Sequence, residues 1–151
     1  MCVYRPQDDT FTPCIVLAYT DRHSCGGTCI QRLYRIPYGG AIGFDTLVSL
    51  KIIEKKEKYP HIKLHLYLPC HGQESMWNDN LKRAYYYVLK RADSVRYSSE
   101  SYTQGCMHKR NREMVDRANL CVAYCSGGKG GSAYTVSYAE KNGIPIINLF
   151  K

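Results

Sequence analysis

The chain has 151 residues, of which 44% are hydrophobic and 23% are charged, and 21 Lys and Arg against 13 Asp and Glu give a formal net charge of +8. This composition is ordinary for one globular domain with a buried core, and it excludes a disordered, collagen-like or coiled-coil chain. No apolar stretch approaches the roughly 20 residues of a membrane-spanning helix, and the N-terminus lacks the pattern of a secretory signal, so we predict a cytoplasmic protein with no membrane partner.

The first 35 residues follow no regular period. Ile15 to Ala18 is a short run typical of a strand, whereas residues 20–28 show no helical spacing and contain two adjacent glycines. We therefore predict a single domain over residues 1–151 whose first 35 residues are irregular.

From residue 36 onward, short apolar runs alternate with amphipathic segments, which is typical of an α/β domain with a mainly parallel sheet flanked by helices. The predicted strands are residues 62–68, 94–97, 120–124 and 144–150. Four predicted helices carry apolar residues at helical spacing. These residues are Phe44, Leu47, Val48 and Ile52; Leu81, Ala84, Tyr85, Val88, Leu89 and Ala92; Met107, Met114, Val115 and Ala118; and Ala133, Val136 and Ala139.

A first glycine-rich loop, YGGAIGFD, occupies residues 38–45. Glycines let a phosphate approach backbone N–H groups, and the N-terminus of the following helix adds a favourable dipole. We therefore predict that Gly39, Gly40 and Gly43 bind a ligand. Asp45 fits two roles, of which the more common is a cap of that helix and the other is an acceptor for a ribose hydroxyl.

A second glycine-rich loop, SGGKGGS, occupies residues 126–132 between a predicted strand and a predicted helix. Its four glycines, Lys129 and a capping Ser132 would make a phosphate cradle, although a plain flexible turn is the alternative. The loop lacks the Gly-Lys-Ser/Thr ending of a Walker A motif. Because ligands of parallel sheets bind beyond the carboxyl ends of the strands, we expect both loops at one site.

Two further segments contain candidate ligand-binding residues. Trp77 follows the strand that ends near residue 68, and its ring can stack on a base or close the core. In the same segment Cys70 and His71 are neighbours, so their side chains point to opposite sides of an extended chain and we predict no Cys–His catalytic pair. Arg110 can hold a phosphate and Asn111 can bind a base or sugar edge, with a surface salt bridge as the alternative for the arginine.

The cysteines and the positive charge are both spread along the chain. Eight cysteines include no CxxC pair, so we predict no metal and no disulfide framework, and we predict no cofactor. Residues 61–118 carry 10 basic and 6 acidic residues, and no run of basic residues alternates with aromatic ones. Binding of single-stranded nucleic acid is therefore a less favoured hypothesis.

Taken together, these segments resemble the YpsA-like branch of the SLOG superfamily, a Rossmann-like group that includes DNA-processing protein A and the LOG phosphoribohydrolases. The matching stretches are GGAIGFD (39–45), YPHIKLHLYLPCHGQ (59–73), Trp77, YYYVLKRAD (85–93), CMHKRNREMVD (106–116) and GGKGGSAYTVSYA (127–139). The resemblance implies a bacterial or phage protein with a Rossmann-like fold that binds a nucleotide or nucleotide-derived ligand, as a sensor or regulatory module.

The resemblance also assigns parts of the site. It implies that Gly39, Gly40, Gly43 and Asp45 form one wall, that Gly130, Gly131 and Ser132 hold the phosphate, and that Arg110 and Asn111 close the site from the side. It leaves open whether the chain forms a homo-oligomer.

Two features depart from this group. LOG enzymes have a glutamate three residues after the threonine of PGGxGTxxE, where this chain has Tyr134 or Thr135, depending on the alignment. A nucleotide glycosidic-bond hydrolase is therefore the alternative function, with Asp45 as its candidate catalytic residue. In addition, the TGHRP-like motif is reduced to residues 2–6, CVYRP, and the sequence leaves open whether this region is native, truncated or frame-shifted.

Overall fold

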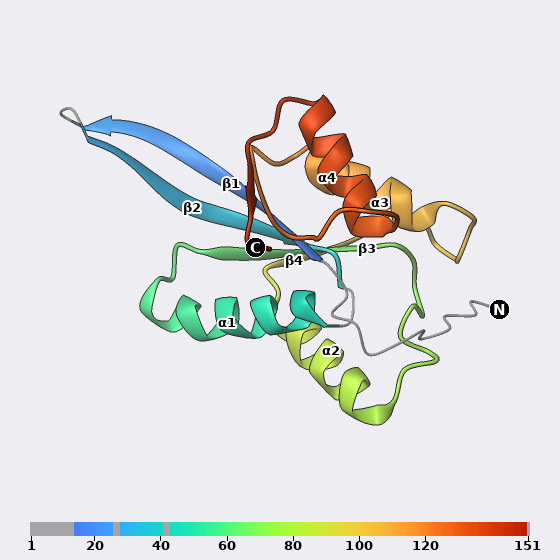
Figure 1. Cartoon of the computed structure of the whole chain (residues 1–151). Coiled ribbons are helices and arrows are strands. Elements are labelled where there is room, and N and C mark those ends of the chain that lie inside the picture. The colour runs from blue at the N-terminus through green and yellow to red at the C-terminus, as the bar shows by residue number, and fades with distance from the viewer. Residues whose placement is uncertain (1–13, 26–27, 41–42, 151) are drawn as a thin grey trace.

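The computed structural model describes residues 14–25, 28–40 and 43–150, which form one sheet with helices on both faces (Figure 1). Its strands are β1 (Cys14–Cys25), β2 (Thr28–Tyr38), β3 (Lys63–Leu68), β4 (Ser94–Tyr97), β5 (Leu120–Tyr124) and β6 (Ile146–Asn148). Its helices are α1 (Phe44–Lys58), α2 (Asp79–Arg91), α3 (Cys106–Val115) and α4 (Gly131–Lys141). The motif at residues 2–6, together with Ala41 and Ile42, lies outside the described residues.

The six described strands lie in the order β4-β3-β2-β1-β5-β6. β2, β3 and β4 are parallel to one another, as are β5 and β6, while β1 is antiparallel to both β2 and β5. All the strands except β1 therefore run in one direction, and their carboxyl ends meet at one edge of the sheet. This arrangement confirms the predicted α/β fold with a mainly parallel sheet.

Two apolar clusters hold the helices on the sheet. On one face, α1 and α2 pack on Leu64, Leu66 and Leu68 of β3, which alternate with more exposed residues as a strand period requires. On the other face, α3 and α4 pack on Cys121 and Ala123 of β5. Figure 1 shows these two helix pairs on opposite sides of the sheet. The carboxyl edge of the sheet is thus left between two firmly packed layers.

β1 and β2 form a hairpin that extends well beyond the sheet (Figure 1). β1 pairs with β5 only through Cys14–Ala18, and β2 pairs with β3 only through Arg35–Tyr38. The sequence pattern predicts only Ile15–Ala18 as a strand in this region. It missed β2 because the apolar residues of Thr28–Tyr38 do not alternate regularly with polar ones.

Several predicted details differ from the structure. Leu47 is 60% exposed and Met107 is 38% exposed, although both were expected in the core. α3 instead buries Cys106, Arg110 and Met114, which lie four residues apart on one helix face. The last strand is also shorter than predicted, since β6 covers Ile146–Asn148 only. None of the described helices combines the length and apolar character needed to cross a membrane.

Candidate functional site

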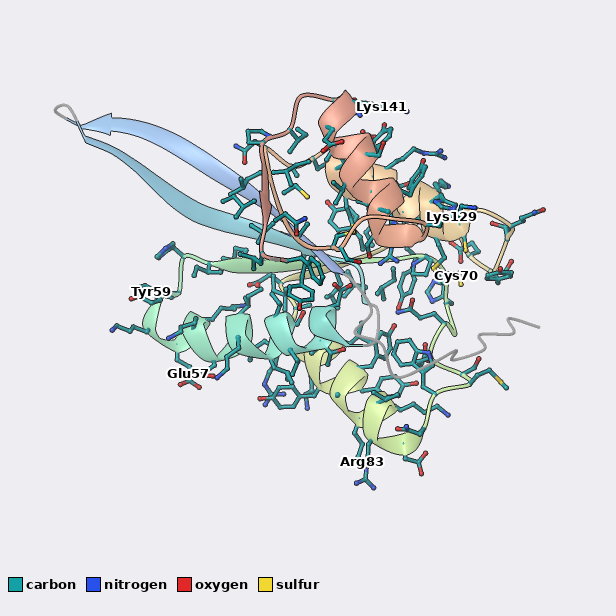
Figure 2. The ribbon with its side chains drawn as sticks, viewed as in Figure 1. Glu57, Tyr59, Cys70, Arg83, Lys129 and Lys141 are labelled. Atoms are coloured by element: carbon teal, nitrogen blue, oxygen red, sulfur yellow. The ribbon has the colours of Figure 1, made fainter. Side chains whose placement is uncertain are left out.

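Both glycine loops lie at the carboxyl edge of the sheet, as the sequence predicted. The first follows β2 and the second follows β5, and these two strands run in the same direction with β1 between them. Figure 2 shows Lys129, in the second loop, and Cys70, after β3, at the same end of the molecule. This is the position at which ligands of open α/β sheets bind.

The start of the first loop is packed tightly against protein atoms, whereas Gly43 at its end is exposed and has open space around it. Gly39 and Gly40 are both buried. A Cβ on Gly39 would collide with the Arg110 guanidinium. At Gly40, φ is +67°, and a Cβ would lie 2.5 Å from Leu68 Cδ2 and 2.9 Å from Gln73 Nε2. The need for glycine at these two positions is therefore explained by internal packing and backbone conformation.

Asp45 is the last residue of the first loop and is only 4% exposed. Its Oδ2 would be 3.3 Å from a Cβ on Gly39, the same position that the Arg110 guanidinium approaches. The N-cap of α1 is Gly43, whose φ is +102°, so Asp45 is the second residue of the helix and not its N-cap. Asp45 therefore does not cap α1, contrary to the prediction. It is instead an acidic residue in the first turn of α1, where the helix dipole favours a negative charge.

Consecutive residues of α3 contact the first loop and α4. Arg110 is 7% exposed and its Nη1 donates a hydrogen bond to the Gly39 carbonyl. The Asn111 side-chain amide donates to Thr135 Oγ1 at 2.8 Å, and this hydroxyl donates to the Gly131 carbonyl, also at 2.8 Å. The structure thus places Arg110 at the first loop and links Asn111 to the start of α4, behind the second loop.

The glycines of the second loop are exposed, in contrast to the buried Gly39 and Gly40 of the first loop. Gly127, Gly128, Gly130 and Gly131 are all exposed, and a Cβ at any of them would meet nothing within 4 Å. Positive φ explains the first three of these glycines. Gly131 begins α4 without a positive φ, so neither packing nor conformation requires a glycine there. The N-cap of α4 is Gly130, and the predicted cap Ser132 is instead the second residue of the helix.

Trp77 takes the core-closing role that the sequence left as one of two alternatives. Its ring packs edge-to-face on Tyr85, with 5.4 Å between the ring centroids, and contacts the cluster under α1 and α2. Cys70 is 2% exposed, whereas the His71 side chain is 54% exposed and stacks on Tyr97 at 3.6 Å between ring centroids. The thiol and the imidazole therefore face different environments.

Two residues of this edge were not identified from the sequence. Gln73 Nε2 donates to the Gly40 carbonyl at 3.2 Å and also contacts the Tyr85 hydroxyl. Burial, together with nearby Tyr97 and Glu74, raises the pKa of Tyr85. The other missed residue is Thr135, which is 4% exposed. Only its helical spacing from Gly131 could have indicated this role, because a threonine hydroxyl can bond to the carbonyl four residues earlier.

Four cysteines of the described region lie in the protein interior. Cys70, Cys106, Cys121 and Cys125 are all buried. Burial raises the pKa of Cys121 to about 11, which keeps this thiol protonated. Among the residues that the structure describes, no three His, Cys, Asp or Glu side chains are grouped as metal ligands would be.

The fold and its two loops define a Rossmann-like α/β domain. Comparison with known proteins identifies the family within this class. The family model YpsA (YspA SLOG family) matches residues 30–145. The chain belongs to this family. The match begins after β1, in agreement with the departure seen near the N-terminus of the sequence.

Curated relatives support this assignment. The chain is 31% identical over 123 residues to the SPbeta prophage-derived protein YoqJ of Bacillus subtilis. The aligned region covers 74% of this chain and 72% of YoqJ. It is 28% identical over 105 residues to the UPF0398 protein BH1768 of Halalkalibacterium halodurans, and 28% identical over 104 residues to a UPF0398 protein of Bacillus pumilus. These matches cover 68% and 67% of this chain but 56% of each UPF0398 protein.

Proposed function

We propose that the chain binds a nucleotide or nucleotide-derived small molecule at the carboxyl edge of its sheet and acts as a sensor or regulatory module. The observation that carries this proposal is the exposed Gly131 at the start of α4, where nothing in the protein requires glycine. A glycine at a helix N-terminus lets a phosphate approach the N–H groups of the first turn without a Cβ in the way.

The link through α3 supports a site that uses both loops. Arg110 contacts the Gly39 carbonyl, and Asn111 contacts Thr135, which holds the Gly131 carbonyl. The start of α4, where a ligand of the second loop would bind, is therefore connected through α3 to the first loop. Gly39, Gly40, Gly43 and Asp45 form the wall of this proposed site, and Gly130, Gly131 and Ser132 its phosphate end.

The environment of the acidic residues favours binding over glycosidic hydrolysis. The Asp45 carboxylate is 4% exposed and borders Gly39 and Arg110. At the position of the LOG glutamate, Thr135 is buried and engaged with Gly131, and Tyr134 accepts a hydrogen bond from Arg112 at 3.2 Å. None of these groups presents an exposed carboxylate that could stabilise positive charge at a ribosyl carbon.

Calorimetry tests the proposal directly. The purified chain is titrated with AMP, ADP-ribose and cyclic nucleotides, and at least one of them should give a saturable heat. Gly131→Asp adds a negative charge at the phosphate end and should lower the affinity at least tenfold. This variant should remain folded, since the position is open and an acid at a helix N-terminus is favourable.

Ser137→Asp is the matched control, because it adds the same charge at an exposed position further along α4. Its affinity should stay within about twofold of the original chain at 0.15 M salt, where exposed charges are screened over roughly 8 Å. A folded sample that binds none of the ligands would exclude the proposal. Equal losses in the two variants would place the ligand away from the second loop.

Hydrolysis is tested separately. Incubation with nucleoside monophosphates should release no free base that chromatography detects above a protein-free control. If base is released and Asp45→Ala abolishes the release, the site is that of a hydrolase and the binding module is the wrong function.

A further inference from the structure

The solvent face of α2 carries a continuous stripe of basic and aromatic side chains. Arg83, Tyr86, Tyr87, Lys90 and Arg91 are all exposed and follow one another at i, i+3, i+4, i+7 and i+8, which is one face of a helix. The opposite face of α2 buries Tyr85 and Val88. Figure 2 shows Arg83 extending away from the body of the molecule. We call these five residues the α2 stripe.

The rings of the stripe are presented to solvent beside its cations. Tyr86 is 51% exposed and Tyr87 is 43% exposed. The Arg91 guanidinium lies over the Tyr87 ring, 3.7 Å from its centroid, so the two planar groups are held together by a cation–π contact. The Tyr86 hydroxyl donates to Glu74 at 2.9 Å, which fixes the position of that ring.

The charge of the stripe is of one sign. It holds three cations and no acid. Asp79 and Glu74 lie at or before the first turn of α2, and Asp93, two residues after Arg91, forms ion pairs with Lys56 and Lys63. In the linear sequence these basic and aromatic residues are interrupted by core residues, so only the folded helix brings them onto one surface. Figure 2 shows Arg83 of the stripe on the opposite side of the sheet from Lys129 of the second glycine loop.

We propose that the α2 stripe binds single-stranded nucleic acid. Exposed tyrosines and guanidinium planes stack on unpaired bases, while lysine and arginine contact the phosphates between them. An anionic membrane is a poorer match, because the stripe has no aliphatic side chain to insert between lipids. An acidic protein would match the cations but would leave both exposed rings without a stacking partner.

Fluorescence anisotropy with labelled oligo(dT) and oligo(U) of 20 nucleotides tests this proposal. Binding should be detected at 50 mM salt and should weaken roughly twentyfold at 200 mM, as expected for about three phosphate contacts on a single strand. A folded protein that binds neither oligonucleotide at 50 mM salt would overturn the proposal.

Charge variants locate the surface. Arg83→Glu combined with Lys90→Glu should lower the affinity at least tenfold. The matched control combines Arg117→Glu with Lys141→Glu, which changes the charge equally at exposed positions after α3 and at the end of α4. The control should lose less than threefold, and equal losses in both variants would show that only the net charge matters.

Ring variants separate stacking from charge. Tyr86→Ala combined with Tyr87→Ala keeps the charge and should weaken binding about fivefold or more, because stacking on one aromatic ring contributes at least that factor. The corresponding double Phe variant keeps both rings and should bind within about twofold of the original chain. Equal affinities of the Ala and Phe variants, or binding to phosphatidylglycerol vesicles without binding to either oligonucleotide, would contradict the proposal.

Discussion

Arg110 and Gly39 depend on each other for their positions. The guanidinium donates to the Gly39 carbonyl and fills the space that a side chain at residue 39 would occupy. The sequence named both as ligand-binding residues, and their place beside one another at the carboxyl edge agrees with the predicted order of the motifs. What the sequence could not reveal is that Arg110 is itself buried, because Cys106, four residues earlier on the same helix face, was not predicted to face inward.

Alanine should be costly at Gly39 and tolerated at Gly131. Gly39→Ala forces its Cβ into the Arg110 guanidinium and should lower the free energy of unfolding by about 1–3 kcal/mol. Gly131→Ala meets no atom within 4 Å and adds a better helix former, so it should be neutral or stabilise by up to about 1 kcal/mol. Urea denaturation measures both, and a Gly39→Ala protein as stable as the original would show that the contact is not tight.

Asp93 should contribute stability that depends on pH. Partial burial acts to raise the pKa of Asp93, but hydrogen bonds from Lys56 and from the Leu64 N–H, together with the charges of Lys56 and Lys63, outweigh burial and lower it. The stabilisation is therefore present above the unfolded-state pKa of about 3.9, and it is lost as the pH falls through the lower folded-state pKa.

Asp93→Asn should consequently lower the free energy of unfolding by about 1–2 kcal/mol at pH 7. The difference from the original chain should shrink below about pH 4, where the carboxylate takes up its proton. Thermal or urea unfolding across this range measures the effect. Glu57→Gln, at an exposed position of α1, is the control, and an equal pH dependence in both variants would exclude a specific role for Asp93.

At the scale of secondary-structure elements, α3 and α4 are connected by polar contacts. Asn111 donates to Thr135, and Tyr138 donates from its hydroxyl to Asp116 at 2.9 Å. The apolar spacing of Met114, Val115, Ala133, Val136 and Ala139 predicted that these helices pack inward, which the structure confirms. Their mutual polar contacts could not be predicted, because helical spacing determines the face of a residue but not its partner on another helix.

A double-mutant cycle should show that Asn111 and Thr135 are coupled. Asn111→Ala and Thr135→Val should each destabilise the chain, and the double variant should be more stable than the sum of the single effects predicts, by about 0.5–1.5 kcal/mol. Chemical denaturation of the four proteins measures this coupling. Strict additivity would mean that the hydrogen bond contributes nothing to the packing of α3 against α4.

The other elements were predicted most accurately where their apolar residues recur at a regular spacing. β3 and α2 were predicted nearly to their ends, because β3 alternates regularly and α2 has a clean apolar stripe. α1 was predicted with a misplaced core residue, since its highly charged second half leaves few apolar positions to define a face. The hairpin strand β2 was missed because backbone pairing, rather than a regular side-chain pattern, defines it over most of its length.

At the scale of the whole molecule, the hairpin has a part inside the sheet and a part outside it. From Thr20–Leu33 to Cys25–Thr28, β1 and β2 pair only with each other. Replacing residues 22–31 with Asn-Gly, which favours a tight hairpin turn, should therefore change the free energy of unfolding by less than about 1 kcal/mol.

Val122→Pro tests the interior of the sheet in the same experiment. Val122 pairs with Val16 of β1 and with Ile147 of β6, so a proline there removes a hydrogen bond of the ladder and should cost about 3 kcal/mol or more. If the shortened hairpin loses as much stability as this variant, the extended part of the hairpin supports the fold.

The antiparallel strand β1 also sets a length scale for the ligand. It separates β2 from β5, so that the strands carrying the two glycine loops stand two inter-strand spacings apart, roughly 10 Å, instead of about 5 Å. A single phosphate cannot bridge this span. One molecule that contacts both loops must place its anionic group at one end and a separate sugar or base at the other, so inorganic phosphate alone should bind far more weakly than a whole nucleotide.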